Sequence, residues 1–111
     1  MIAEQLDRQV PKTDMPNTAH IVFVAIELLI PASASLKSKR RVLNSLKDKI
    51  RARLNASVAE IDYLEQWQRS VIGVSMIGND RIYLEKGVNV IAELLRGNAE
   101  IETLNFRPEW L

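Results

Sequence analysis

Basic side chains cluster where the sequence predicts the start of a helix, and this cluster is the strongest indication of ligand binding in the chain. Ser35 is a residue type that commonly caps helices, and four basic residues follow it within two turns, namely Lys37, Lys39, Arg40 and Arg41. A helix N-terminus already carries about half a positive charge from its unpaired amides, so basic residues there are unfavourable unless an anion offsets them. Small hydroxyl residues and free amides just before the helix suit phosphate oxygens. We therefore expect this segment to bind an anion.

The charge of the chain is distributed unevenly. Its net charge is only +1, yet Lys37 to Arg53 holds eight basic residues and one acidic residue, so the rest of the chain is acidic. A basic element on an acidic body is the electrostatic signature of a polyanion-binding surface. The alternative is a solvated amphipathic helix whose basic stems cover the edges of the core. On a helical wheel, Lys37, Arg40, Arg41 and Arg51 lie on one flank of the apolar stripe, and Lys39, Lys49 and Arg53 border its other side.

A second candidate contact lies in a predicted hairpin. Trp67, Gln68 and Arg69 combine an aromatic plane, an amide and a guanidinium. Such a group can stack on a base or anchor a partner protein. The alternative is that Trp67 folds back over the edge of the sheet.

Patterns for catalysis are weak. Glu60 and Asp62 alternate onto one face of a predicted strand, but acid–base work by paired carboxylates requires a shifted pKa in a cleft with a nucleophile or metal. We expect them to pair with Arg69 or with the basic helix. His20 is the only histidine and there is no cysteine, so the sequence predicts no metal cluster. We expect no catalytic residue, no metal and no cofactor, and a binding protein rather than an enzyme.

The elements that position these residues follow the order β-α-β-β-α-β. This order predicts an α+β, ferredoxin-like two-layer sandwich, in which a four-stranded antiparallel sheet carries two helices on one face. Ser35 and Asn79 or Asp80 are the expected helix caps, and Gly97 and Asn98 end the second helix. The expected strands are His20 to Ile30, Ala56 to Tyr63, Arg69 to Gly78 and Glu100 to Phe106.

The length of 111 residues predicts one domain. Met1 to Thr18 contains two prolines and no sustained period, which indicates a flexible tail before a single ferredoxin-like domain over residues 19–111. The longest apolar run, Ile21 to Ile30, is too short to span a bilayer and contains Glu27, so we expect no membrane contact and a cytoplasmic location.

The two faces of the first strand differ in character. One is uniformly apolar and is expected to lie under the helices. The other is mixed and is expected to be open, which makes it a candidate surface for a homodimer. The mixed face comprises Phe23, Ala25, Glu27 and Leu29.

Several separated motifs together resemble a known family. They are Ser35-Leu-Lys-Ser-Lys-Arg-Arg, Ser57-Val-Ala-Glu-Ile-Asp-Tyr, Trp67-Gln-Arg-Ser-Val-Ile-Gly-Val and the terminal Pro108-Glu-Trp-Leu. In this order they resemble the bacterial YlxP-like family, a domain of unknown function, over residues 20–111. The resemblance implies a ferredoxin-like fold. It also implies a ribosome- or RNA-linked role, because genes of this family often lie near those for ribosome-binding factor A and translation initiation. No catalytic residues are established for the family, and its members tend to begin almost at the first strand, which makes Met15 an alternative start.

These observations lead to one main hypothesis and two alternatives. We expect an RNA-binding or ribosome-associated accessory protein, with RNA or a ribosomal subunit as its partner. The alternatives are a small-anion or phosphate-chemistry site at the start of the first helix, and a homo-oligomeric scaffold that meets through the open sheet face. The residues expected to contact the nucleic acid or anion are Ser35, Lys37, Lys39, Arg40, Arg41, Arg51, Trp67 and Arg69.

Overall fold

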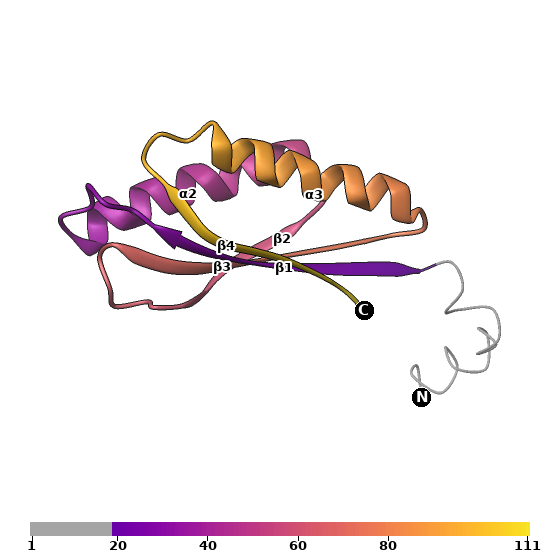
Figure 1. The fold of residues 1–111 in the computed structure, drawn as a ribbon, viewed down its shortest axis with the longest axis horizontal. Coiled ribbons are helices and arrows are strands. Elements are labelled where there is room, and N and C mark those ends of the chain that lie inside the picture. The colour runs from indigo at the N-terminus through magenta and orange to yellow at the C-terminus, as the bar shows by residue number, and fades with distance from the viewer. Residues whose placement is uncertain (1–18) are drawn as a thin grey trace, which may run out of the picture.

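The computed structural model describes residues 19–111; the tail predicted for Met1 to Thr18 lies outside the described residues. The elements are β1 (His20–Leu29), α2 (Leu36–Arg53), β2 (Ser57–Asp62), β3 (Arg69–Gly78), α3 (Arg81–Arg96) and β4 (Glu102–Trp110). The strands form one antiparallel sheet in the order β2-β3-β1-β4. Both helices lie on one side of this sheet (Figure 1). The structure therefore has the ferredoxin-like α+β sandwich that the sequence predicts.

Alternation along β1 decides which side of the sheet is covered. Successive side chains of a strand point to opposite faces, so one apolar set of alternate residues lies beneath the helices. Apolar residues at helical spacing on α2 and α3 complete the core between the two layers. The fully buried members of this core are Val22, Val24, Ile26, Leu28, Leu46, Ile50, Ile72, Val74 and Ile91.

Local hydrogen bonds set the helix ends where the sequence predicts them. The Ser35 hydroxyl accepts a hydrogen bond of 3.0 Å from the Ser38 amide at the start of α2. Asp80 accepts hydrogen bonds from two amides at the start of α3, and Gly97 follows its last turn. These caps satisfy amides that otherwise lack a partner inside the helix.

The last strand is longer than the sequence predicts. It was expected over residues 100–106, but β4 continues to Trp110, which pairs with Val22. Pro108 hides this continuation in the sequence, because proline removes a backbone donor and is tolerated mainly in edge strands. β4 is an edge strand in the sheet order, and the half-buried Trp110 packs against the core.

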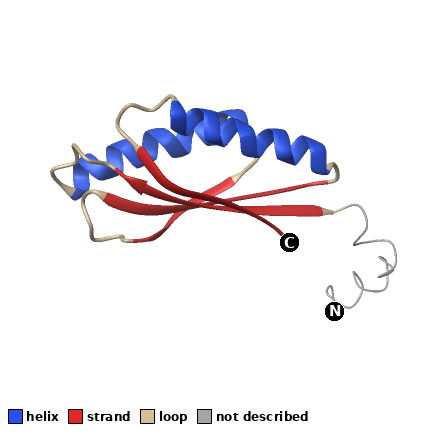
Figure 2. Ribbon diagram, in the orientation of Figure 1, coloured by secondary structure: helices blue, strands red, loops and turns tan. Residues whose placement is uncertain are grey.

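The other side of the sheet carries no described helix or strand (Figure 2). Here the Phe23 ring lies over Gly73, since a Cβ added at Gly73 would lie 2.9 Å from the Phe23 Cε1 atom. A residue larger than glycine would push the ring away from the sheet. Among residues 19–111, neither helix is both long enough and apolar enough to cross a membrane.

Candidate nucleic-acid interface

Four basic residues, three exposed and one half-buried, form a row along the flank of α2 next to strand β2. We define the basic row as Lys37, Arg40, Lys47 and Arg51. Their spacing keeps them on one side of a helix with 3.6 residues per turn, and the row rises about 21 Å from end to end. The Arg51 Nη2 atom donates a hydrogen bond of 3.0 Å to the Val58 carbonyl. This contact places the row beside β2, an edge strand of the sheet.

Most of the charge in the basic row is uncompensated. Among the described residues, Lys37, Arg40 and Lys47 have no ion-pair partner. Arg51 has only Asp48, with 4.0 Å between its Nη1 atom and the carboxylate oxygen. Sequence reasoning missed Lys47, although its position ten residues after Lys37 and four before Arg51 was a usable signal. The row therefore presents positive charge that an external anion can neutralise.

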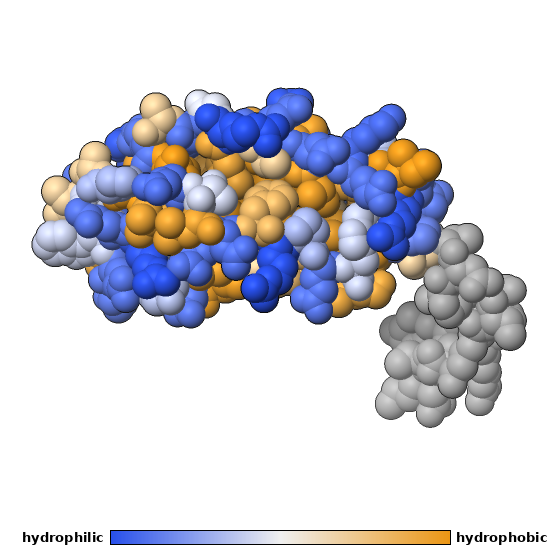
Figure 3. All heavy atoms as spheres, in the orientation of Figure 1, coloured by the Kyte–Doolittle hydropathy of each residue, from blue (hydrophilic) through white to orange (hydrophobic). Residues whose placement is uncertain are grey.

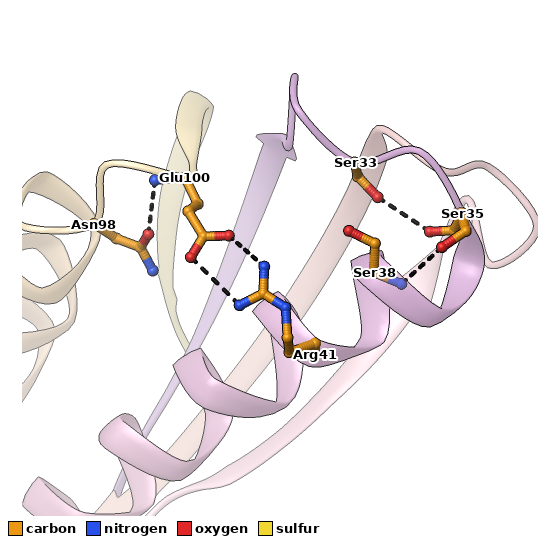
Figure 4. A network of polar contacts seen from close by, with 6 residues as sticks. All are labelled: Ser33, Ser35, Ser38, Arg41, Asn98 and Glu100. Carbon is orange, nitrogen blue, oxygen red and sulfur yellow. Dashed lines mark hydrogen bonds and ion pairs between the residues drawn. The ribbon is translucent and has the colours of Figure 1, made fainter.

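Arg41 does not belong to this row, because its side chain pairs with a residue on the other side of the helix. Its Nη2 atom lies 2.7 Å from Glu100 Oε2, in the loop before β4 (Figure 4). The Asn98 side chain accepts a hydrogen bond from the Glu100 amide and so holds that loop residue in place. The hydrogen bond from Arg41 lowers the pKa of Glu100, and the same bond raises the pKa of Arg41. The wheel placed Arg41 on the flank of Lys37, but the structure pairs its charge elsewhere.

Lys39 is buried, so the prediction that it contacts the nucleic acid or anion is wrong. Its side chain is 1% exposed, and its Nζ atom lies 2.7 Å from Glu60 Oε2. The same ammonium donates a hydrogen bond of 2.7 Å to the Tyr63 carbonyl. Glu60 also accepts a hydrogen bond from the buried Ser70 hydroxyl. A buried charge needs this pairing, so Lys39 connects α2 to the hairpin. The predicted pairing of Glu60 with the basic helix is confirmed. The same prediction is wrong for Asp62, because the strand register shifts between the two residues, and Asp62 lies on the other face and accepts a hydrogen bond from the Tyr63 amide.

Arg69 also lies away from the basic row. Its guanidinium forms an ion pair with Glu27 on the open side of the sheet and lies 4.3 Å from the centre of the Tyr63 ring. The hydrogen bond to Glu27 raises the pKa of Arg69. The structure therefore does not bring Arg69 together with the row.

Trp67 belongs to a loop that is held against the start of α2. The Gln68 side chain donates a hydrogen bond of 3.2 Å to the Ser33 carbonyl, and the Gln68 carbonyl accepts one of 2.8 Å from the Ile30 amide. The loop joining β2 to β3 thus lies at the same end of the molecule as the first turn of α2 (Figure 1). Trp67 is 53% exposed in this loop. An exposed aromatic residue therefore lies at the end of the molecule where the basic row begins.

The serine hydroxyls at the start of α2 form hydrogen bonds with the backbone of the same segment. Ser33 donates to the Ser35 carbonyl at 3.1 Å, while the Ser35 hydroxyl oxygen accepts from the helix amide of Ser38 (Figure 4). These bonds stabilise the turn and the first residues of the helix. Within residues 19–111, no group of three histidine, cysteine, aspartate or glutamate residues could hold a metal ion.

Comparison with known proteins gives two agreeing matches. The family described as "Protein of unknown function (DUF503)" matches residues 21–108. The chain is also similar to a protein of Bacillus subtilis (strain 168) named "Uncharacterized protein YlxP". The two are 32% identical over 90 residues, which cover 81% of this chain and 98% of the relative.

Proposed function

The chain belongs to the DUF503 family of proteins of unknown function, and we propose that it is an RNA-binding or ribosome-associated accessory protein that contacts phosphates through the basic row. One observation carries this proposal. Three cations of the row have no ion-pair partner among the described residues, while other basic residues nearby are neutralised by Glu60, Glu100 and Glu27. Positive charge is thus uncompensated along one line of the surface, although Lys49 and Arg53, exposed on α2 outside the row, also have no ion-pair partner among the described residues.

The length of the row suits a nucleic acid strand. Each phosphate advances about 3.4 Å along one strand of a duplex, so a row of about 21 Å runs beside about six phosphates. Lysine and arginine contacts to phosphates fix position without reading base sequence. We therefore propose recognition of the backbone by the row, supplemented by stacking of an unpaired base on Trp67.

Co-sedimentation with ribosomal subunits over a salt series tests the proposal. The wild-type chain is expected to migrate with a subunit at low salt and to be released as salt increases. The double variant Lys37→Glu/Arg40→Glu is expected to lose binding, because the local charge is reversed. The matched control is Lys86→Glu/Arg96→Glu, which makes the same charge change at exposed positions on α3.

The control separates a local contact from a general charge effect. If both double variants bind equally weakly, only net charge matters and the basic row is not the contact surface. If the row variant is folded by circular dichroism and binds ribosomal subunits and RNA as the wild type does, the proposed function is wrong.

A further inference from the structure

An apolar patch lies on the open side of the sheet. We define the open-face patch as Ile21, Phe23, Ile61, Val71 and Ile77. Ile21 pairs with Ile77 across β1 and β3, and both Phe23 and Ile61 lie within 3.4 Å of the position that a Cβ of Gly73 would occupy. The exposed fractions of the three isoleucines are 36%, 49% and 62% in chain order. Figure 3, viewed across the sheet, shows hydrophobic residues reaching the surface on the side away from the helices.

The charges around this patch do not suit a polyanion. Residues directly opposite each other in an antiparallel pair share a face, so Glu109 and Arg107 lie beside Phe23 and Ala25. The charged residues that the register places on the open face are Glu27, Asp62, Arg69, Glu102, Arg107 and Glu109. Four are acidic and two are basic. The open face thus repels phosphate slightly, whereas it offers both signs of charge to a second copy of itself.

The size of the face fits a dimer interface. Four strands about 4.8 Å apart, with about nine residues rising about 3.4 Å each, give a face of about 600 Å². Two copies packed face to face would bury about 1,200 Å² in total, the lower end of the range for specific interfaces. A contiguous apolar patch on a monomer commonly marks such a contact.

From the patch, the mixed charge and the area, we propose that the open sheet face is the interface of a homodimer. In a two-fold dimer each surface meets its own copy, so Arg107 of each copy can approach acidic residues of the other. The α2 helices lie on the opposite side of the sheet (Figure 2). Dimerisation therefore leaves both basic rows exposed, and this inference does not depend on RNA binding.

Sedimentation equilibrium over a concentration series tests the dimer. The wild-type chain is expected to dimerise reversibly, and Ile61→Lys is expected to weaken dimerisation by more than tenfold because it places a charge inside the interface. The matched control is Ile82→Lys, the same substitution at a residue on α3 that is 65% exposed. This control is expected to dimerise as the wild type does.

Distance measurements between single spin labels give a second test that does not rely on a disruptive variant. The chain has no cysteine, so Ser75→Cys and Ser45→Cys each provide one labelling site. Ser75 is exposed on the open face and Ser45 is exposed on α2. The label-to-label distance in the dimer is expected to be much shorter for residue 75 than for residue 45.

Each contrary result overturns the inference. A wild-type chain that stays monomeric at several hundred micromolar is not a homodimer. A dimer that is unaffected by Ile61→Lys, or that has the shorter distance at residue 45, uses another surface. A monomer whose RNA affinity falls on Ile61→Lys uses the open face for RNA. Loss of RNA binding in the Lys37→Glu/Arg40→Glu variant leaves dimerisation unchanged, which separates this inference from the proposed function.

Discussion

The Lys39 ammonium lies 2.7 Å from the Glu60 carboxylate beneath the loop that joins β2 to β3. The ammonium also donates a hydrogen bond to the carbonyl of Tyr63, a residue with a φ of 59°. A positive φ is uncommon for a residue with a side chain. Lys39 therefore helps to hold the loop in a conformation that the chain would otherwise seldom adopt.

Removal of the Lys39 charge is expected to destabilise the fold. Lys39→Met leaves Glu60 without its cation and the Tyr63 carbonyl without its donor, and the loss of one partner from a buried ion pair costs about 3 kcal/mol. Urea unfolding measures this change in the free energy of unfolding. The control Lys37→Met, at an exposed position, should change it by less than about 0.5 kcal/mol.

A second substitution at Glu60 is expected to restore part of that loss. In Lys39→Met/Glu60→Gln the uncompensated carboxylate is gone, while the glutamine carbonyl can still accept from the Ser70 hydroxyl. The double variant should therefore be more stable to urea than Lys39→Met alone. If the two variants have the same free energy of unfolding, the unpaired Glu60 carboxylate does not destabilise the fold.

Loss of the cap at the start of α2 is expected to destabilise the chain moderately. Ser35→Ala removes the acceptor for the Ser38 amide, which costs about 1 kcal/mol, whereas Ser35→Asp keeps an acceptor. Thermal unfolding monitored by circular dichroism compares the two. If Ser35→Ala unfolds at the wild-type temperature, the cap contributes nothing to stability.

The salt dependence of RNA affinity distinguishes a polyanion from a single small anion. Contacts with about four to six phosphates give a slope of log affinity against log salt of about −3 to −5. Arg40→Ala and Lys47→Ala should each make this slope shallower by about one unit. A shallow slope that neither variant changes, together with saturable binding of inorganic phosphate, would favour a small-anion site at the start of α2.

Trp67 is expected to contribute by stacking rather than by charge. Trp67→Ala should lower the affinity for single-stranded RNA, by about 1–3 kcal/mol per stacked base, with little change in the salt slope. Trp67→Phe keeps an aromatic plane and should recover part of the affinity. Filter binding at fixed salt provides the measurement. If the alanine variant binds RNA with the wild-type affinity, Trp67 is not part of the contact surface.

The pKa of Glu100 reports its pairing with Arg41. The hydrogen bond from Arg41 holds the pKa of Glu100 below its ordinary value, which is about 4.3 for glutamate. The stability that this pair contributes is therefore present above the ordinary pKa and is lost as the pH falls through the lowered one. NMR titration of the side-chain carboxyl should show the low pKa in the wild type and its return toward the ordinary value in Arg41→Gln. An unchanged value in the variant would contradict the pairing.

Local patterns in the sequence were sufficient to predict the fold. Alternation in β1, the cap residues Ser35 and Asp80 and the terminator Gly97 act on the backbone within a few residues of themselves. Their effect can therefore be recognised without knowledge of the rest of the chain. The βαββαβ order follows from these elements, and the two-layer sandwich follows from the need to bury one face of each. Only β4 ended substantially later than expected, at Trp110 rather than Phe106, where Pro108 interrupts the local signal.

Only the tertiary structure decided which basic residues remain available to a ligand. A helical wheel gives the angle of each side chain about the axis, but it does not identify the neighbour that lies across from it. Arg41 meets Glu100, 59 residues away, and Lys39 is buried because the loop after β2 packs over it. Lys37, Arg40 and Lys47 have no ion-pair partner among the described residues, because no acidic side chain of a distant segment pairs with this flank. The sequence by itself thus determined the basic helix, and packing between distant segments selected the part of it that can contact a partner.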